Sequence, residues 1–250
     1  MAKVAQSVGS VASQAMGVGQ LVISANIASV PSRQKMLDRT IESLYHQVDV
    51  INLCLNGYET DPYAEDSKIN GLISDNSLGD AGKFLFQAQN KGYYFSCDDD
   101  IIYPPTYVRD TIAKVDELGV VTYNGRTFRK YPVRSFYRSK SCKYRYARHE
   151  PETLKVDFGG TGVMAFDTRY FQVPIEAFEA RNMADIWFAV YARSHNVPIW
   201  HLGHEAGYLA SQETEDLIYD EKYRSDRYET EVVNRAFAEN GSSLLKRILG

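Results

Sequence analysis

A chain of 250 residues is long enough for one large α/β domain, and its 44% hydrophobic and 12% aromatic content excludes a disordered or fibrous protein. Three scattered cysteines, Cys54, Cys97 and Cys142, fit neither a disulfide framework nor a zinc site, so we expect a reducing, cytoplasmic location. The net charge of −4 argues against a general nucleic-acid-binding protein, and no apolar run approaches the roughly 20 residues of a transmembrane helix.

The N-terminal part of the chain begins with a segment that lacks a packing pattern. Residues 1–20 carry one charge, Lys3, and no compact apolar block, which predicts a flexible tail. Apolar runs rich in β-branched residues then predict strands at 21–27 and 50–55. Between them, apolar residues recur at helical spacing, which predicts a helix over 33–47.

Strands and helices continue to alternate along the rest of the chain. Further strands are predicted at 72–74, 92–97, 120–123, 163–166 and 198–202, and helices over 80–90, 104–118, 184–194 and 220–239. This alternation is typical of βαβ units, which form a mostly parallel central sheet flanked by helices. No Pro- or Gly-rich linker divides the chain, so we expect a single α/β domain over 21–250.

Three consecutive carboxylates, Asp98, Asp99 and Asp100, directly follow the strand predicted at 92–97. In parallel α/β sheets, ligands bind outside the carboxyl ends of the strands. Adjacent carboxylates repel one another there unless a cation neutralises them, and oxygen ligands favour Mn²⁺ or Mg²⁺. The alternative is a solvated acidic turn at the start of the following helix.

Six motifs along the chain carry a family resemblance. They are SANIASVPSR, VINLCLNGY, LGDAGKF, GYYFSCDDDIIYPP, GTGVMAF and NMADIW. In this order they resemble a family-two-type glycosyltransferase of GT-A fold, of the sort that builds bacterial capsular or surface polysaccharides and some viral glycans. The resemblance covers roughly 20–235, with Asp98–Asp100 as the DxD motif. It implies a Rossmann-like domain with a nucleotide-sugar half (about 21–125) and an acceptor half (about 150–240).

The resemblance also implies an activity. The chain is expected to transfer a sugar from a nucleotide-diphosphate sugar, UDP being the expected nucleotide, to a glycan, a lipid-linked acceptor or another hydroxyl group. The residues that would bind the donor are Ala28, Pro31, Arg33, Tyr58, Asp80, Lys83, Asp98, Asp99 and Gly160. Among them, Tyr58 would stack on the base, Asp80 would contact the base or ribose, and Lys83 would approach the diphosphate.

The remaining roles implied by the resemblance concern the metal and the base. Asp98, Asp100 and His204 would hold the Mn²⁺ or Mg²⁺ ion, and Asp185 would act as the general base in an inverting reaction. Each assignment has a structural alternative. Asp185 would instead cap the helix that follows it, and His204, like His201, would be a packed or solvent-facing side chain.

The other donor residues have alternatives of the same kind. Arg33 and Lys83 would be exposed helix charges, and Tyr58 would cover the edge of the core. The Gly160 turn would approach the donor sugar or the acceptor closely, as glycine permits.

One segment of the chain differs sharply in charge from the rest. Residues 126–148 hold nine Lys or Arg and no Asp or Glu, so the remainder carries 19 basic against 32 acidic residues. The segment is either a flap that binds the acceptor or phosphate, or a mobile solvated loop. Peripheral contact with a membrane is compatible with it, whereas the acidic remainder argues against nucleic acid as a partner.

Two other functions compete with glycosyl transfer. A sugar-phosphate nucleotidyltransferase also uses metal-binding aspartates on an α/β sheet, but the loop after the first strand, SANIASVPSR, lacks the glycines that such an enzyme uses. A non-enzymatic binding module would use the segment 126–148 to hold nucleic acid.

Overall fold

The computed structural model describes residues 21–212 and 225–237 of the chain. The tail predicted at 1–20 lies outside the described residues, as do 213–224 and 238–250. Helix α5 (Arg227–Phe237) confirms the middle of the helix predicted over 220–239. Of the helices in the described part, none combines the length and the apolar composition that a membrane crossing requires.

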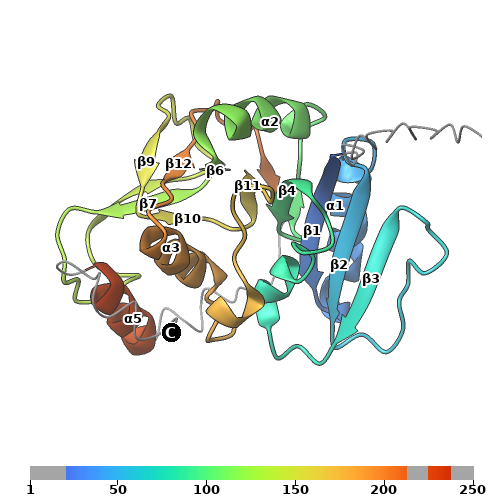
Figure 1. Ribbon diagram of the computed structural model, residues 1–250, viewed down its shortest axis with the longest axis horizontal. Coiled ribbons are helices and arrows are strands. Elements are labelled where there is room, and N and C mark those ends of the chain that lie inside the picture. The colour runs from blue at the N-terminus through green and yellow to red at the C-terminus, as the bar shows by residue number, and fades with distance from the viewer. Residues whose placement is uncertain (1–20, 213–224, 238–250) are drawn as a thin grey trace, which may run out of the picture.

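A single eight-stranded sheet forms the centre of the molecule, in the order β3-β2-β1-β4-β11-β6-β12-β9 (Figure 1). Its strands are β1 (Val22–Ser29), β2 (Val50–Asn56), β3 (Ile69–Ser74), β4 (Gly92–Cys97), β6 (Val120–Thr122), β9 (Leu154–Val156), β11 (Val163–Asp167) and β12 (Ile199–His201). Strands from both halves of the chain therefore belong to one sheet.

The direction of the strands divides this sheet into two regions. The neighbours β3, β2, β1 and β4 are all parallel, as the alternation of strands and helices predicts. Beyond β4, only β6 and β12 pair in parallel, and β11 and β9 run antiparallel to their neighbours. The α/β class is thus confirmed, and the sheet is mixed rather than uniformly parallel.

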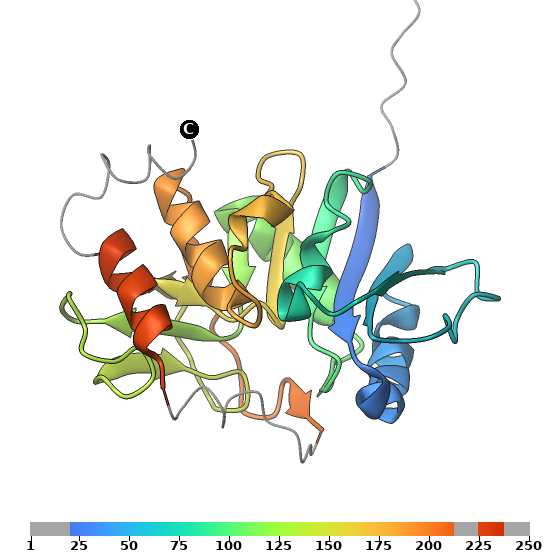
Figure 2. The ribbon, with the colours of Figure 1, turned by 90° about the horizontal axis from the view of Figure 1, so that it is seen from below.

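Helices cover both faces of the sheet. On one face, α1 (Gln34–Tyr45) and α2 (Tyr107–Leu118) bury apolar side chains against it, and on the other face α3 (Ala184–Ser194) packs beside α5 (Figures 1 and 2). Successive side chains of β4 point to opposite faces of the sheet and pack in both layers: Tyr94 lies on the α3 side and Phe95 on the α1 side. The long predicted helices 33–47, 104–118 and 184–194 are all confirmed.

Short elements complete the fold. They are the 3₁₀ turns η1 (Pro31–Arg33), η2 (Gly79–Phe84) and η3 (Ile175–Ala177), a three-stranded sheet of β10 (Phe158–Gly159), β7 (Gly125–Phe128) and β8 (Ser141–Tyr144), and a two-stranded sheet of β5 (Ile101–Ile102) and β13 (Ala210–Ser211).

The prediction of a helix over 80–90 is wrong. The chain forms only the 3₁₀ turn η2 there, followed by further turns. Gly79 has a φ of +56°, which a regular helix excludes, and a Cβ on Gly82 would overlap the side chain of Cys54 on β2. The two glycines therefore let the backbone lie directly on the sheet instead of winding above it.

The basic segment 126–148 is anchored, so the alternative of a mobile solvated loop is wrong. Strands β7 and β8 pair within it, and the loop between them is held by α5. Asn234 of α5 accepts a hydrogen bond from the N–H of Val133 (2.7 Å) and donates one to its carbonyl (2.8 Å). Asp226, just before α5, accepts hydrogen bonds from the Ser135 hydroxyl and from the N–H of Tyr137.

We predict that Asn234→Ala destabilises the protein by about 1–3 kcal/mol, because it leaves both backbone groups of the buried Val133 unsatisfied. Chemical denaturation measures the effect. Glu231→Ala, which removes an exposed ion pair with Arg235 on the same helix, is the matched control and should change the free energy of unfolding by about 0.5 kcal/mol or less. Equal effects of the two variants would show that Asn234 does not anchor the segment.

Candidate functional site

The strand order places a candidate ligand site between β1 and β4. From β1 the chain moves through β2 to β3 on one side and then returns to β4 on the other side, so the strand order reverses between them. In doubly wound sheets, ligands bind outside the carboxyl ends of the strands at such a point. Ser29, Arg33 and the triplet Asp98–Asp100 follow these two strand ends.

Asp99 holds the two strand ends together rather than facing a ligand. Its carboxylate accepts hydrogen bonds from the Ser29 hydroxyl (2.6 Å) and from the Arg33 guanidinium (2.6 Å). Its side chain is only 3% exposed. The Asp99 carboxylate is therefore not accessible for the predicted contact with a donor. Arg33 is partly buried in this ion pair, so the alternative that it is an exposed helix charge is wrong.

Asp98 is the accessible carboxylate of the triplet and pairs with a buried cation. Its side chain is 43% exposed, whereas that of its ion-pair partner Lys83 is 3% exposed. Burial opposes the charge of Lys83, yet the nearby carboxylates of Asp98 and Asp80 raise its pKa above the ordinary value. Lys83 is therefore charged at neutral pH and is not an exposed helix charge.

A glycine outside the predicted set fixes the position of Asp98. A Cβ on Gly162 would overlap the Asp98 carboxylate, and the carbonyl of Gly162 accepts hydrogen bonds from the N–H of Asp98 (3.2 Å) and from the hydroxyl of Tyr103 (2.6 Å). The predicted residue Gly160 lies instead against Asn124, whose carbonyl accepts a hydrogen bond from its N–H (2.8 Å). The close approach in this turn is thus made by Gly162 toward Asp98.

Asp100 is partly exposed and carries a weaker contact. Arg33 reaches its carboxylate at 3.3 Å, and its side chain is 20% exposed. Burial, together with the charges of Asp98 and Asp99, raises the pKa of Asp100 to about 6. Asp98 and Asp100 are therefore the two carboxylates of the triplet that are open to a further cation.

Asp80, in η2, lies near Lys83 and contacts the start of α3. One carboxylate oxygen accepts a hydrogen bond from the N–H of Ala184 (3.1 Å), the first residue of α3. The other oxygen is buried without a hydrogen-bond partner among the described residues. Burial raises the pKa of Asp80 to about 6, against the opposing effect of Lys83. Asp80 thus joins η2 to α3 in this structure, and its predicted contact with a base or ribose stays a prediction.

Asp185 lies in the first turn of α3, close to the same cluster. Its Oδ1 accepts hydrogen bonds from both the N–H and the hydroxyl of Thr161, each 2.7 Å long. Asp185 is exposed at the surface. Desolvation by the surrounding protein and the charge of Asp98 raise the pKa of its carboxyl group, and the hydrogen bonds from Thr161 oppose this rise. Met183 is the N-cap of the helix, so the alternative that Asp185 is the cap is wrong.

Thr161 is the residue that the motif analysis missed. It is buried, and its carbonyl accepts a hydrogen bond from Ser96 of β4, so it links that strand to Asp185. The sequence feature that could have indicated its role is its place inside the run Gly159-Gly160-Thr161-Gly162.

Three predicted donor residues lie near the end of β1. Tyr58 is 9% exposed and its hydroxyl donates to the carbonyl of Val30 (3.1 Å), so little of its ring is open to a base. This position corresponds to the alternative in which Tyr58 covers the edge of the core. Ala28 is half-buried on β1, and Pro31 is exposed at the first position of η1.

His204 is buried among aromatic side chains. Its ring lies 5.5 Å from that of Tyr123 and 5.5 Å from that of His201, and its Nδ1 bonds to the carbonyl of Leu202. Within residues 21–212 and 225–237, no group of three or more His, Cys, Asp and Glu side chains is placed to hold a metal ion. His204 therefore corresponds to its packed alternative, and the three predicted metal ligands do not form one group.

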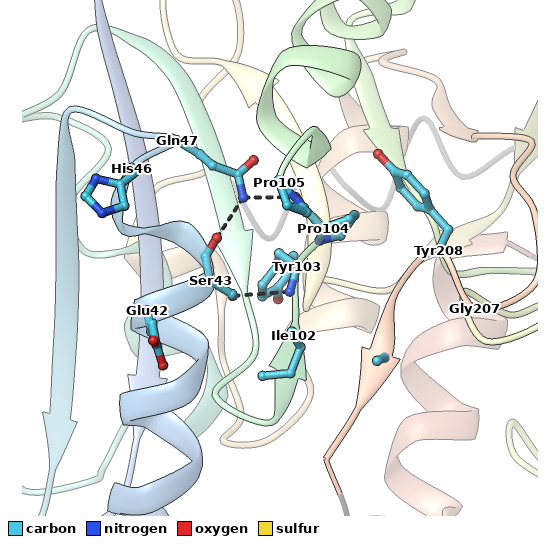
Figure 3. Close-up of a pocket in the computed structure, with 11 residues that line it drawn as sticks. Glu42, Ser43, His46, Gln47, Ile102, Tyr103, Pro104, Pro105, Gly207 and Tyr208 are labelled. Atoms are coloured by element: carbon cyan, nitrogen blue, oxygen red, sulfur yellow. Dashed lines mark hydrogen bonds between the residues drawn. The ribbon is translucent and has the colours of Figure 1, made fainter.

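A pocket of about 560 Å³ opens elsewhere, between the second half of α1, residues 102–105 and residues 207–210 (Figure 3). Ser43 of α1 accepts a hydrogen bond from the N–H of Tyr103 at its wall, and Gln47, just beyond the helix, donates one to the carbonyl of Pro104. None of the Asp98–Asp100 carboxylates lines it, and its surface is mainly apolar. We place the candidate site at the carboxylates, because the groups suited to chemistry converge there.

Comparison with known proteins adds no assignment. No protein-family model matches the chain, and no curated protein shows significant similarity to it.

We predict that Lys83→Met destabilises the protein at pH 7 by about 1–3 kcal/mol, because it leaves the carboxylates around Lys83 without their cation. The value is below that for a fully buried pair, since Asp98 is 43% exposed. Without the cation the raised pKa values of Asp80 and Asp185 rise further, so protonation should remove much of the deficit between pH 7 and pH 5. The exposed Lys91→Met is the control. A deficit that is independent of pH would contradict this account.

Proposed function

We propose that this protein is a metal-dependent glycosyltransferase that moves a sugar from a nucleotide-diphosphate sugar to a hydroxyl acceptor. The observation that carries the proposal is the convergence of Asp98 and Asp100, at the reversal of strand order, with Asp185 at the start of α3. These carboxylates come from the two halves of the chain that the family resemblance assigns to the donor and to the acceptor.

The donor set fits Mn²⁺ or Mg²⁺ bound together with a nucleotide. Magnesium sites commonly use one or two carboxylates and take their remaining ligands from water and substrate phosphates. Asp98 and Asp100 supply two accessible carboxylates, and their mutual repulsion would be relieved by a cation. A bound divalent ion supplies electrostatic stabilisation of a leaving diphosphate.

The chain's own residues would position the reactants around this pair. Lys83 holds Asp98, and Arg33 holds Asp99 and Asp100, so the carboxylates are fixed before a donor arrives. Such preorganisation is the main way in which enzymes stabilise developing charge.

Asp185 is the proposed base. Thr161 occupies its Oδ1 with two hydrogen bonds, which leaves Oδ2 to accept the proton of the acceptor hydroxyl. A raised pKa makes the carboxylate a stronger base at neutral pH. This role belongs to an inverting reaction; in a retaining one, Asp185 would orient the acceptor instead.

A screen of nucleotide sugars with Mn²⁺, in the absence of acceptor, tests the proposed reaction. Slow release of the nucleoside diphosphate from one donor is the expected result. Release of pyrophosphate from a nucleoside triphosphate and a sugar phosphate would favour the nucleotidyltransferase instead. If no donor is either hydrolysed or bound, both enzyme functions are contradicted, and the binding module is the remaining function.

We predict that UDP stabilises the protein far more with Mn²⁺ than with a chelator. At a hundredfold excess over the dissociation constant, binding adds about 2.7 kcal/mol, or a rise in Tm of roughly 5–10 °C for a chain of this size. Asp100→Asn should abolish the difference between Mn²⁺ and chelator. Asp116→Asn, the same charge change on the exposed face of α2, should retain it. Equal thermal shifts of the wild type with and without Mn²⁺ would exclude the metal bridge.

We predict that Asp185→Asn lowers the rate of transfer about 10²–10⁴-fold, because the amide is not a base. The amide oxygen can still accept the Thr161 hydrogen bonds, so Tm and donor affinity should stay close to those of the wild type. Steady-state transfer and donor titration measure the two effects separately. Near-normal transfer by the variant would leave Asp185 a structural role only, and loss of donor binding would place it in the donor pocket.

A further inference from the structure

The basic segment 126–148 presents an ordered array of positive charge. Its exposed members lie on the ends and the loop of the β7–β8 hairpin: Arg129, Lys130, Arg134, Arg138, Lys140, Arg145 and Arg148. Two further members, Arg126 and Lys143, are half-buried within the strands. Because α5 anchors the loop by side-chain hydrogen bonds to its backbone, these charges keep fixed positions relative to the sheet.

Most of these charges lack an acidic partner among the described residues. Seven of the nine side chains form no ion pair with any residue of 21–212 or 225–237: Arg129, Lys130, Arg134, Lys140, Lys143, Arg145 and Arg148. Glu150 approaches Arg145, but it accepts a hydrogen bond from the backbone N–H and not from the guanidinium. An external anion is the partner that such a surface fits.

Two of the charges are held directly opposite each other. Arg126 of β7 pairs with Lys143 of β8 in register, so both side chains leave the same face of the hairpin. Like charges in this position destabilise a sheet. Burial, followed by the charges of Arg126 and Arg145, lowers the pKa of Lys143. Arg126 already donates a hydrogen bond to the carbonyl of Phe136 (2.7 Å), so a carboxylate or phosphate bound at Lys143 and Arg145 would offset the local positive charge.

The hairpin that carries these charges is joined to the backbone that holds the proposed base. Gly125 of β7 pairs with Gly159 of β10, and the chain then passes through Gly160 to Thr161, which bonds to Asp185. Tyr137, in the loop of the hairpin, has its pKa raised by burial and by the charge of Asp185. An acceptor anchored on the hairpin would therefore extend toward Asp185.

The geometry points to a subsite for an anionic acceptor: we propose that Lys143 and Arg145 bind the carboxylate or phosphate group of a charged glycan whose hydroxyl Asp185 activates. The inference rests on the proposed function, because it treats Asp185 as the acceptor-side base.

An anionic glycan fits this surface better than a membrane or a nucleic acid does. The large apolar residues of the segment, Phe128, Val133 and Phe136, are buried, so it offers no large apolar side chain for insertion between lipids. The remainder of the chain is strongly acidic and would repel an extended polyanion. A short acceptor with one or a few charges meets only the local cationic group.

Binding of oligosaccharides without donor tests the subsite independently of catalysis. The probes are fluorescently labelled hexagalacturonate, which carries a carboxylate on each sugar, and labelled maltohexaose, which is neutral. Glucose 6-phosphate as a competitor reports whether phosphate is accepted as well. We expect anisotropy to show binding of hexagalacturonate that weakens with salt, and no binding of maltohexaose.

Matched variants assign the binding to the proposed residues. Lys143→Gln with Arg145→Gln should weaken hexagalacturonate binding at least about tenfold, the effect of one lost charge-assisted contact. Lys143→Arg should preserve binding. Lys91→Gln, at the amino end of β4, removes an exposed charge far from the hairpin and should have no effect. Melting curves of all variants confirm that they are folded.

Several outcomes would overturn the subsite. These are equal binding of the neutral and the charged oligosaccharide, an unchanged affinity in the double variant, or submicromolar binding of single-stranded DNA or of phosphatidylserine vesicles at physiological salt. Failure of the proposed function is distinguishable: hexagalacturonate would then bind and depend on Lys143, while no nucleotide sugar is hydrolysed. If a donor is hydrolysed but hexagalacturonate does not bind, only the subsite is wrong.

Discussion

The buried ammonium group of Lys83 lies among carboxylates that come from three separate elements. Asp98 follows β4, Asp80 belongs to η2, and Asp185 starts α3. Without a cation between them, these carboxylates would repel one another. The close approach of η2, β4 and α3 at this end of the sheet therefore depends on one charged side chain, and the proposed reaction depends on that approach.

The three aspartates of the triplet have different contacts. The Asp99 carboxylate accepts hydrogen bonds from Ser29 and Arg33, which connects the ends of β1 and β4. Its neighbours then project from a fixed backbone and keep part of their surface open. A buried central carboxylate between two accessible ones thus combines a structural contact with a pair of ligands suited to a divalent ion.

The hairpin 126–148 carries charge of the opposite sign. It follows β6 and is held by α5, so its position is set by packing rather than by attraction to the carboxylates. In the proposed reaction, the phosphates of a donor would bind through a metal ion, and an anionic acceptor would bind through Lys143 and Arg145.

Local patterns in the sequence determined the strands β1, β2 and β4, the helices α1, α2 and α3, and the carboxylates at the end of β4, because apolar periodicity records which face each segment buries. Only the tertiary structure decided that η2 is a 3₁₀ turn, that Tyr58 is buried, and that Asp80 caps α3 from over a hundred residues away. It also decided that His204 forms no metal-binding group with the triplet in the described residues, and that the segment 126–148 is an anchored hairpin. Such outcomes depend on contacts between distant segments, which no local pattern encodes.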